Sequence, residues 1–363
     1  MPDIPAVDGR PAAATPLSGI PCCEDLLERE GLGPPLEEEL PEGHVLDGRF
    51  IIREAIGRSA MATIYRAEDR EARGASVAVK VPLARVESDP AQFGRFQREE
   101  RIVSSLGGPG VLRFVAAPQG RSRPYFVTEY LDGCTLALVI HRSRPIPERD
   151  ALAIASALCQ ALGPMHEADI VHGDLKPANV MICRDHTLCL MDFGLASEIS
   201  SGSGFLGSLM PLFGTPEYMA PEQVRNKRCD ARTDIYCVGV ILYQMLTGVL
   251  PFAHEDPWEA AQLRVSGDPA APRSLNPSIS PQAEEIVLRA MRRDPRERYQ
   301  GAWEMKKDLD SPEQVRVTGL SDRLKAPRWR LSLLGTPIAA GVLIGAGSLL
   351  ALVGLFFLLT RLH

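Results

Sequence analysis

The sequence predicts an α+β protein of two lobes, a small antiparallel-sheet lobe followed by a mainly helical lobe, with one C-terminal transmembrane helix. Short runs rich in β-branched residues between residues 50 and 130 predict the sheet. Stretches with helical spacing follow from residue 149 onward. An uncharged stretch of thirty residues, 331–360, predicts the membrane span.

Length, charge and cysteine content limit the class of protein. The 363 residues suffice for two lobes that each bury a core. The formal net charge of −6 argues against a nucleic-acid partner, which would require a surplus of positive charge. The eight cysteines are scattered, and none shows the Cys-x-x-Cys spacing of a zinc site. They are typical of reduced thiols in a cytosolic domain, with a disulfide framework as the less favoured alternative.

Residues 1–45 are predicted to form an acidic, proline-rich and disordered leader. They contain ten acidic and two basic residues, and few large apolar side chains that could offset the entropy of folding. No basic segment followed by an apolar stretch occurs there, so the leader does not resemble a signal peptide. A solvated segment is the simplest interpretation, and a docking or inhibitory segment is the alternative.

The local hydrophobic pattern predicts the individual elements. Strands are expected at five places, 50–52, 62–66, 76–81, 114–115 and 125–130. A turn around 57–60 joins the first two, and a helix with apolar spacing covers 93–106. In the second lobe the expected helices are 149–166, 234–246, 284–292 and 302–309.

The stretch 172–194 carries the residue types with the most chemistry. Asp174, Lys176 and Asn179 lie within six residues, and Asp192 follows eighteen residues after Asp174. The apolar pattern between them is typical of a short hairpin. Two carboxylates, an amide and a lysine at the two ends of one hairpin could hold magnesium and a triphosphate.

Five motifs occur in the order found in one enzyme family. From the N-terminus they are Val77-Ala78-Val79-Lys80, Glu99, His172-Gly173-Asp174 with Asn179, Asp192-Phe193-Gly194, and Ala220-Pro221-Glu222. Across residues 46–309 the chain therefore resembles the eukaryotic-like (Hanks-type) serine/threonine protein kinases, most closely their bacterial membrane-anchored branch. The resemblance implies the bilobal protein-kinase fold, ATP and Mg²⁺ as cofactors, and Ser/Thr residues of proteins as acceptors.

The resemblance also assigns roles around the phosphates and the metal. Lys80 would hold the α- and β-phosphates and pair with Glu99, for which Glu100 is the competing partner. Asp174 would accept the proton of the substrate hydroxyl, and Lys176 would neutralise the γ-phosphate. The two expected ligands of Mg²⁺ are Asn179 and Asp192.

The adenine pocket is less sharply defined. The resemblance places the hinge that bonds the base at Glu129 to Leu131, with Thr128 guarding the pocket behind it. The side chains expected to enclose the ring are those of Ile64, Ala78 and Met181. Apolar residues at these positions are equally compatible with an ordinary core, so they add little by themselves.

Two positions depart from the family pattern. Glycines are expected at 57, 59 and 62 to bind phosphate, but the sequence has Gly57, Ser59 and Ala62. Because glycine lets backbone amides approach phosphate, the two replacements are expected to lower nucleotide affinity or rate without excluding binding. Gly173 stands where many kinases have an arginine that pairs with a phosphate of the activation loop. Its presence predicts an activity that depends less on loop phosphorylation than in kinases with that arginine.

Other residues of the second lobe have expected regulatory or structural roles. Serines at 200, 201, 203 and 208 are candidate autophosphorylation sites, with plain loop composition as the alternative. Thr215, together with Lys176, indicates Ser/Thr rather than Tyr acceptors. Glu222 is expected to form a buried ion pair with Arg298, and Asp234 to anchor the backbone of the catalytic loop.

The C-terminal segments predict a membrane anchor. Residues 310–330 form a linker with a basic end, 331–360 can span a hydrocarbon core of ~30 Å, and 361–363 form an extracytoplasmic tail. The positive residues before the span place the kinase domain on the cytoplasmic side of the inner membrane. Gly341 and Gly345 form a Gly-x-x-x-Gly motif that favours a homodimer, although small residues are common in membrane helices.

Two hypotheses about function follow. The first is an active membrane-anchored Ser/Thr kinase that uses ATP and Mg²⁺ and also phosphorylates itself. The second is a pseudokinase, a nucleotide-binding signalling scaffold whose degenerate glycine loop no longer supports turnover. The presence of every expected phosphate- and metal-binding side chain favours the enzyme.

Overall fold

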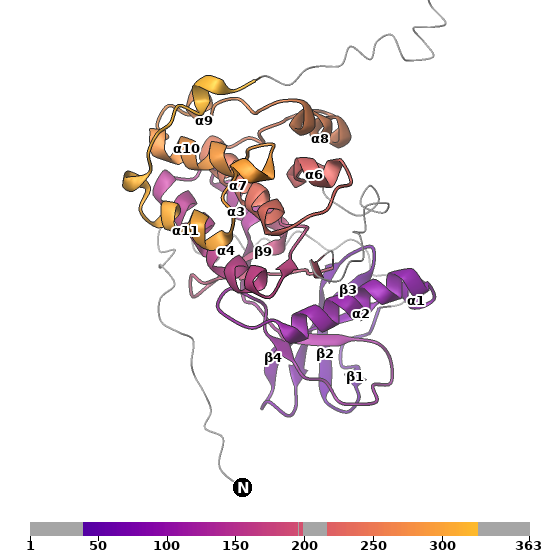
Figure 1. Ribbon diagram of the computed structural model, residues 1–363. Coiled ribbons are helices and arrows are strands. Elements are labelled where there is room, and N and C mark those ends of the chain that lie inside the picture. Colours follow the sequence, from indigo (N-terminus) through magenta and orange to yellow (C-terminus); the bar gives the residue numbers. More distant parts are fainter. Residues whose placement is uncertain (1–38, 195, 199–215, 326–363) are drawn as a thin grey trace, which may run out of the picture. The chain divides into compact units, whose positions relative to one another are not determined.

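A computed structural model describes residues 39–194, 196–198 and 216–325. A sheet-based N-terminal lobe is followed by a helical C-terminal lobe, which confirms the predicted two-lobed α+β architecture (Figure 1). Among the described residues, no helix is long and apolar enough to cross a membrane. The predicted span 331–360, most of the leader and the four candidate loop serines lie outside the described residues.

The N-terminal lobe is built on a six-stranded antiparallel sheet with the order β1-β2-β3-β4-β6-β5. Its strands are β1 (Val45–Leu46), β2 (Phe50–Arg58), β3 (Ala62–Asp69), β4 (Ala75–Pro82), β5 (Phe114–Val115) and β6 (Phe126–Glu129). The prediction of five strands omitted β1, a two-residue strand that pairs with the start of β2. Order also begins before residue 46, since the Gly43 amide donates to the Ile52 carbonyl at 2.8 Å.

The alternation along β4 separates a core face from a functional face. Val77, Val79 and Val81 are buried in the core of the sheet, and the two residues between them, Ala78 and Lys80, are half-buried on the opposite face. Successive side chains of a strand point to opposite faces, so this pattern fixes the direction of the Lys80 side chain.

Helix α2 (Pro90–Ser105) covers the functional face of the sheet. Asp89 caps the helix by accepting hydrogen bonds from two backbone amides of the first turn, and proline occupies the first helical position. Phe96 packs against Phe126 of β6, with ring centroids 5.2 Å apart. Residues one turn apart share a helix face, so this packing also turns Glu99 toward the sheet.

Two small sheets follow the six-stranded sheet along the chain. The first has the order β10-β9-β7, and its strands are β7 (Gly133–Thr135), β9 (Val180–Cys183) and β10 (Leu188–Leu190). Strands β9 and β10 pair antiparallel, which confirms the predicted hairpin, whereas β7 was not predicted. The second sheet pairs β8 (Ile170–Val171) with β11 (Ser197–Glu198).

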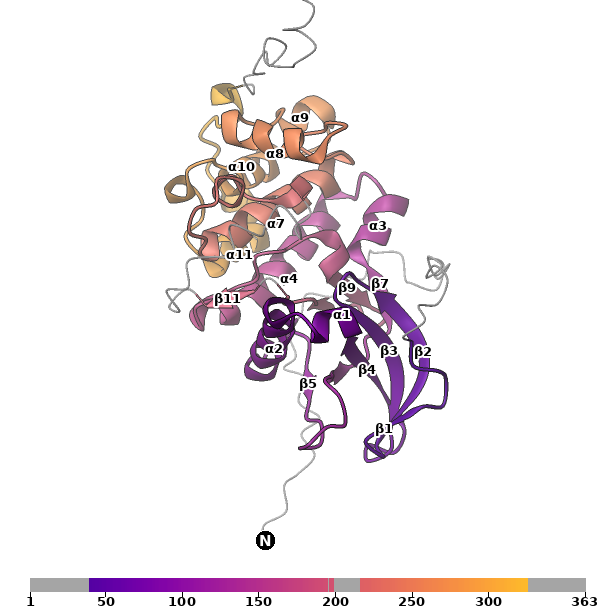
Figure 2. The same ribbon diagram turned by 90° about the vertical axis from the view of Figure 1, so that its right-hand side faces the viewer.

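The C-terminal lobe packs around α4 (Glu148–Glu167) and α7 (Ala231–Thr247) (Figure 2). Helix α7 is buried on nearly all sides, as its apolar sequence requires, and it ends at Gly248 in the left-handed conformation with φ +78°. The other predicted helices are confirmed as α10 (Pro281–Ala290) and α11 (Ala302–Asp310). Five further helices were not predicted from the sequence, namely α1 (Ala84–Glu87), α3 (Leu136–Arg142), α6 (Pro221–Val224), α8 (Pro257–Ser266) and α9 (Pro272–Leu275).

Short 3₁₀ turns complete the described chain. They are η2 (Pro177–Asn179), η5 (Pro216–Tyr218), η6 (Pro295–Glu297), η7 (Pro312–Gln314) and η8 (Ser321–Arg323). The six cysteines of the described part of the chain form no disulfide bond with one another.

Candidate active site

A lysine with two carboxylates joins the sheet to the helical lobe. Lys80 Nζ on β4 lies 2.5 Å from Glu99 Oε1 on α2 and 3.5 Å from Asp192 Oδ1. The predicted pairing of Lys80 with Glu99 is thereby confirmed, and the competing residue Glu100 instead lies 2.7 Å from Arg121. Burial opposes the charged form of Lys80, but the two nearby carboxylates outweigh it and raise the pKa of this amine. Lys80 is therefore a fixed cation at neutral pH.

A second polar cluster forms within the loop between β8 and β9. The amine of Lys176 donates to Asp174 Oδ2 at 2.8 Å, and the amide of Asn179 donates to the same oxygen at 3.2 Å and to the Asp174 carbonyl at 2.9 Å. Burial raises the pKa of Asp174, and the neighbouring Lys176 opposes that rise. The structure thus brings together the three residues predicted to carry catalysis.

The buried carboxylate of Asp234 on α7 holds this loop in place. Its two oxygens accept hydrogen bonds from the backbone amides of His172 at 2.9 Å and Gly173 at 3.0 Å, as predicted. The ring of His166 lies 2.9 Å from the same carboxylate. Although burial opposes ionisation, these hydrogen bonds keep the pKa of Asp234 below its usual value. The loop backbone is therefore fixed by an internal charge.

Asp192 adopts a backbone conformation that few non-glycine residues adopt. Its φ is +59°, in the left-handed region, and such strain persists only where surrounding contacts impose it. The next residue, Phe193, is buried with its ring 5.2 Å from that of His172. The Asp192 side chain stays about half exposed, and Lys80 lowers the pKa of its carboxyl group. The strain thus presents an ionised, accessible carboxylate beside the lysine.

These oxygen donors fit a magnesium ion held partly by phosphates. The side-chain amide nitrogen of Asn179 donates to Asp174. Within the described residues, the side-chain amide oxygen of Asn179 accepts no hydrogen bond. Among these residues, no group of three or more His, Cys, Asp or Glu side chains is placed to hold a metal ion by themselves. Magnesium commonly takes only one or two protein ligands and completes its shell with water and phosphate, which suits Asn179 and Asp192.

The residues predicted to contact adenine are placed by the sheet. The register pairs Ile64 with Lys80 and Ala78 with Thr128, so these side chains share the functional face with the lysine. Glu129 ends β6, and within the described part of the chain no hydrogen bond uses the amide of Leu131. Met181 is half-buried on β9, and Gly57 faces Ile64 across the β2–β3 pair. No hydrogen bond or ion pair of the described residues joins these positions to the two polar clusters.

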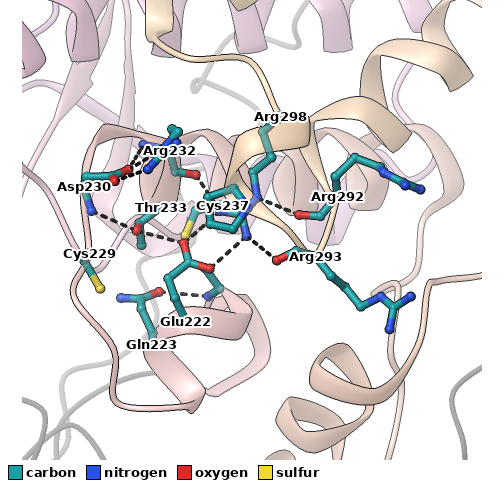
Figure 3. Close-up of polar contacts among 12 residues, drawn as sticks. Glu222, Gln223, Cys229, Asp230, Arg232, Thr233, Cys237, Arg292, Arg293 and Arg298 are labelled. Atoms are coloured by element: carbon teal, nitrogen blue, oxygen red, sulfur yellow. Dashed lines mark hydrogen bonds and ion pairs between the residues drawn. The ribbon is translucent and has the colours of Figure 1, made fainter.

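A buried ion pair holds the C-terminal lobe behind the site (Figure 3). Both terminal guanidinium nitrogens of Arg298 lie 2.8 Å from carboxylate oxygens of Glu222 on α6, as predicted. The next residue, Gln223, was not predicted to have a role, yet its amide donates to the Gly173 carbonyl at 2.8 Å. Its place directly after the Ala-Pro-Glu triplet was the only available signal.

Arg264 on α8 is a second residue that sequence reasoning missed. It is fully buried and donates to the carbonyl oxygens of Pro216 and Glu217, and at 3.5 Å to that of Met219. One arginine in an amphipathic helix is typical of a solvent-exposed charge, so the sequence held no sign of this contact. Its effect is to fix the backbone of the segment that precedes α6.

Comparison with known proteins identifies the family. The sequence profile described as the protein kinase domain matches residues 50–308, most of the chain. This chain belongs to the protein kinase family. It is 35% identical over 295 residues to the serine/threonine-protein kinase PknB of Mycolicibacterium smegmatis, an overlap of 78% of this chain and 47% of that protein. It is 36% identical over 276 residues to a probable serine/threonine-protein kinase of Streptomyces coelicolor, an overlap of 75% and 41%.

The resemblance to bacterial serine/threonine kinases is thus confirmed, and this kinase chain spans about half the length of the curated relatives it matches. Its fold is similar to the crystal structure of the PknI kinase domain of Mycobacterium tuberculosis, with a TM-score of 0.57 and 23% identity. That similarity covers 76% of this chain and 99% of the other, and it supports the bilobal kinase fold.

Ser59 forms hydrogen bonds within the turn between β2 and β3, where the family has its glycine-rich phosphate loop. The hydroxyl of Ser59 accepts hydrogen bonds from the amides of Met61 at 3.2 Å and Ala62 at 3.0 Å, at the turn between β2 and β3. Ala62, in contrast, is fully buried against Phe96 and Phe126 under α2. Of the two departures from the glycine pattern, only Ser59 therefore engages amides that the loop could offer to phosphate.

Replacing Ser59 with alanine is expected to lower the KM for ATP of this kinase about threefold. The change releases two amides from hydrogen bonds that each contribute only ~1 kcal/mol net, so they become available to phosphate. Steady-state kinetics at varied ATP concentration would measure the effect, with Ala62→Gly as the control that leaves the hydroxyl in place. An unchanged or higher KM in Ser59→Ala would contradict this prediction.

Replacing Lys176 with alanine is expected to shift the acid limb of the kinase's pH–rate profile to higher pH. A general base must be deprotonated, so activity falls as the pH drops through the pKa of Asp174. Lys176 lowers that pKa, and its loss leaves the raising effect of burial unopposed. The profile of kcat/KM would show the shift, whereas Lys176→Arg keeps the cation and should keep the limb. An acid limb at the same pH in Lys176→Ala as in the wild type would contradict the effect of Lys176 on the pKa of Asp174.

Proposed function

We propose that this chain is a membrane-anchored serine/threonine protein kinase that transfers the γ-phosphate of ATP to hydroxyl groups of cytoplasmic proteins. The contact of Lys80 with both Glu99 and Asp192 is the observation that most supports the proposal. It aligns the phosphate-binding lysine with a metal-binding carboxylate from the other lobe, the arrangement that phosphoryl transfer by a protein kinase requires.

The side chains divide the chemistry between them. Asp174 accepts the proton of the attacking hydroxyl, and Lys176 neutralises charge on the γ-phosphate. Lys80 orients the α- and β-phosphates, while the backbone of Glu129 and Leu131 bonds the base. Magnesium, when bound by Asp192 and Asn179, supplies positive charge to the phosphate oxygens.

The direct test is transfer of labelled γ-phosphate by the full chain to a generic protein substrate such as casein. Label is expected on serine and threonine after acid hydrolysis, and none with an otherwise identical Asp174→Asn chain. Equal labelling by both chains, or no labelling by either while ATP still binds, would instead support the nucleotide-binding scaffold. The closed Ser59 turn is the one observation that favours this second function.

Activity is expected to persist without phosphorylation of the activation loop. Gly173, with φ +74°, provides no cation for a loop phosphate, and its carbonyl is held by Gln223. We expect a chain with every Ser and Thr from 197 to 208 changed to alanine to keep at least about half of its transfer rate, because Gly173 offers no charge-assisted pairing to a phosphate. A complete loss of activity in this chain would contradict the expectation.

The proposed cellular location of the kinase is supported by the sequence alone. We propose that 331–360 spans the inner membrane, with the kinase domain cytoplasmic, because this stretch is uncharged and follows basic residues. Recovery of the full chain in washed membranes, and of a chain ending at residue 330 in the supernatant, would support the span. A homodimer through Gly341 and Gly345 predicts that Gly341→Ile weakens self-association in membranes.

A further inference from the structure

A basic hollow opens on the C-terminal lobe, beside the end of α6. Its volume is about 600 Å³, and it lies among the end of α6, the segment 292–297 and the last described residue, Lys325. The backbone at this end is fixed, since the Asp268 amide donates to the Lys325 carbonyl at 2.8 Å and the Lys325 amide to the Asp268 carboxylate at 3.0 Å.

Positive charge exceeds negative charge in the lining of this basic hollow. Seven lysines and arginines and four acidic residues line it, and five of the cations are exposed, namely Arg225, Lys227, Arg228, Arg296 and Lys325. Each of the four carboxylates already has an arginine partner. These pairs are Glu222 with Arg298, Asp268 with Arg293, Asp294 with Arg296 and Glu297 with Arg292.

Four lining cations are not among these partners, namely Arg225, Lys227, Arg228 and Lys325, and the first, second and fourth of them are available to a ligand. Within the described residues, the amines of Lys227 and Lys325 lie within 4 Å of no carboxylate, and the Arg225 guanidinium donates only to the Val265 carbonyl at 3.1 Å. The Arg296 hydrogen bond holds the pKa of Asp294 at about 2, so this carboxylate stays ionised at neutral pH.

The buried ion pair gives the hollow its rigid shape. Arg298 donates to the backbone carbonyls of Arg292 at 2.6 Å and Arg293 at 3.3 Å. Figure 3 shows the side chains of Arg292 and Arg293 pointing away from this pair. The hollow is also linked to the catalytic loop, because Gln223, adjacent to the lining residue Glu222, donates to the Gly173 carbonyl.

We propose that this basic hollow is a docking site for an acidic peptide segment of the kinase's protein substrates. The inference rests on the proposed function, since it names a substrate class. A hollow of this size with three unpaired cations complements a short run of Asp, Glu or phosphorylated residues, and electrostatic complementarity of this kind mainly raises encounter rate and selectivity. Docking here lies outside the reacting groups, so it acts on substrate KM rather than on kcat.

The test compares two charge-reversed full chains in neutral detergent. The first carries Arg225→Glu, Lys227→Glu and Lys325→Glu, and the matched control carries the same charge change at exposed positions elsewhere, Arg73→Glu, Arg101→Glu and Lys307→Glu. A labelled peptide of alternating glutamate and glycine, without ATP, is the binding probe. We expect its Kd to rise about tenfold in the first chain and less than about twofold in the control.

Kinetics then connect binding to substrate choice. An acceptor peptide extended by the same acidic segment should show about a tenfold higher KM with the first chain and an unchanged kcat, and the unextended acceptor should show neither change. Equal Kd values in the wild-type and first chains, or equal losses in the control, would overturn the docking site. Tighter probe binding after deletion of residues 1–38 would assign the hollow to the chain's own acidic leader and overturn the substrate assignment. Retained probe binding with no phosphoryl transfer would support the site and contradict the proposed function.

Discussion

Replacing Asp174 with asparagine is expected to lower the rate of phosphoryl transfer by ~10²–10⁴-fold, the usual contribution of a positioned general base. The amide has nearly the same shape and can still accept the hydrogen bonds of Lys176 and Asn179 through its oxygen. It cannot take a proton from the substrate hydroxyl. The measurement is kcat for a serine peptide under saturating ATP and Mg²⁺.

ATP affinity should change little in the Asp174→Asn chain, because Lys80, Glu99 and Asp192 form a separate set of contacts. Asp185→Asn is the matched control. This exposed residue lies in the turn of the same hairpin and accepts a hydrogen bond from Thr187 at 2.6 Å. A kcat of Asp174→Asn within about threefold of the wild type would refute the base assignment.

Replacing Arg298 with alanine is expected to lower the free energy of unfolding by about 3–5 kcal/mol, because it leaves the Glu222 carboxylate buried without its partner. The guanidinium is 1% exposed and also donates to the Arg232 carbonyl at 2.8 Å. Its loss therefore removes both an ion pair and the hydrogen bonds of three backbone carbonyls. Urea denaturation followed by circular dichroism would measure the change.

Two controls separate the effect of burial from that of charge. Arg296→Ala removes an arginine that is 83% exposed and paired with Asp294 at 2.6 Å, and it should change the free energy of unfolding far less than Arg298→Ala. The double variant Glu222→Gln with Arg298→Met should recover part of the loss, since no uncompensated charge remains buried. Equal destabilisation by Arg298→Ala and Arg296→Ala would contradict this view of the pair.

The strong periodic patterns and the motif residues could be predicted from the sequence. The Val-Ala-Val-Lys alternation specified which face of β4 carries Lys80, and the choice of Glu99 over Glu100 is confirmed by the 2.5 Å contact. The hairpin β9–β10 followed from its apolar pattern. Short elements such as β1 and β7, which were missed, are stabilised by the neighbouring strands to which they pair.

Contacts across the fold that no family motif marks could not be predicted, because no local pattern encodes them. From the sequence, Ser59 and Ala62 were equivalent replacements of the expected glycines. In the structure, the Ser59 hydroxyl accepts hydrogen bonds from amides of the turn, whereas the Ala62 side chain fills the core under α2. Arg264 likewise gave no sign of its burial against the carbonyls of the segment before α6.

By itself, the sequence determined the family, the lysine and carboxylates of the site and the chemical role expected of each, since residue type and spacing are local properties of the chain. Only the tertiary structure decided that Lys80 reaches Asp192 from the other lobe and that the Arg298 pair shapes a basic hollow. Both depend on segments more than seventy residues apart, whose approach is set by packing of buried faces rather than by any local preference.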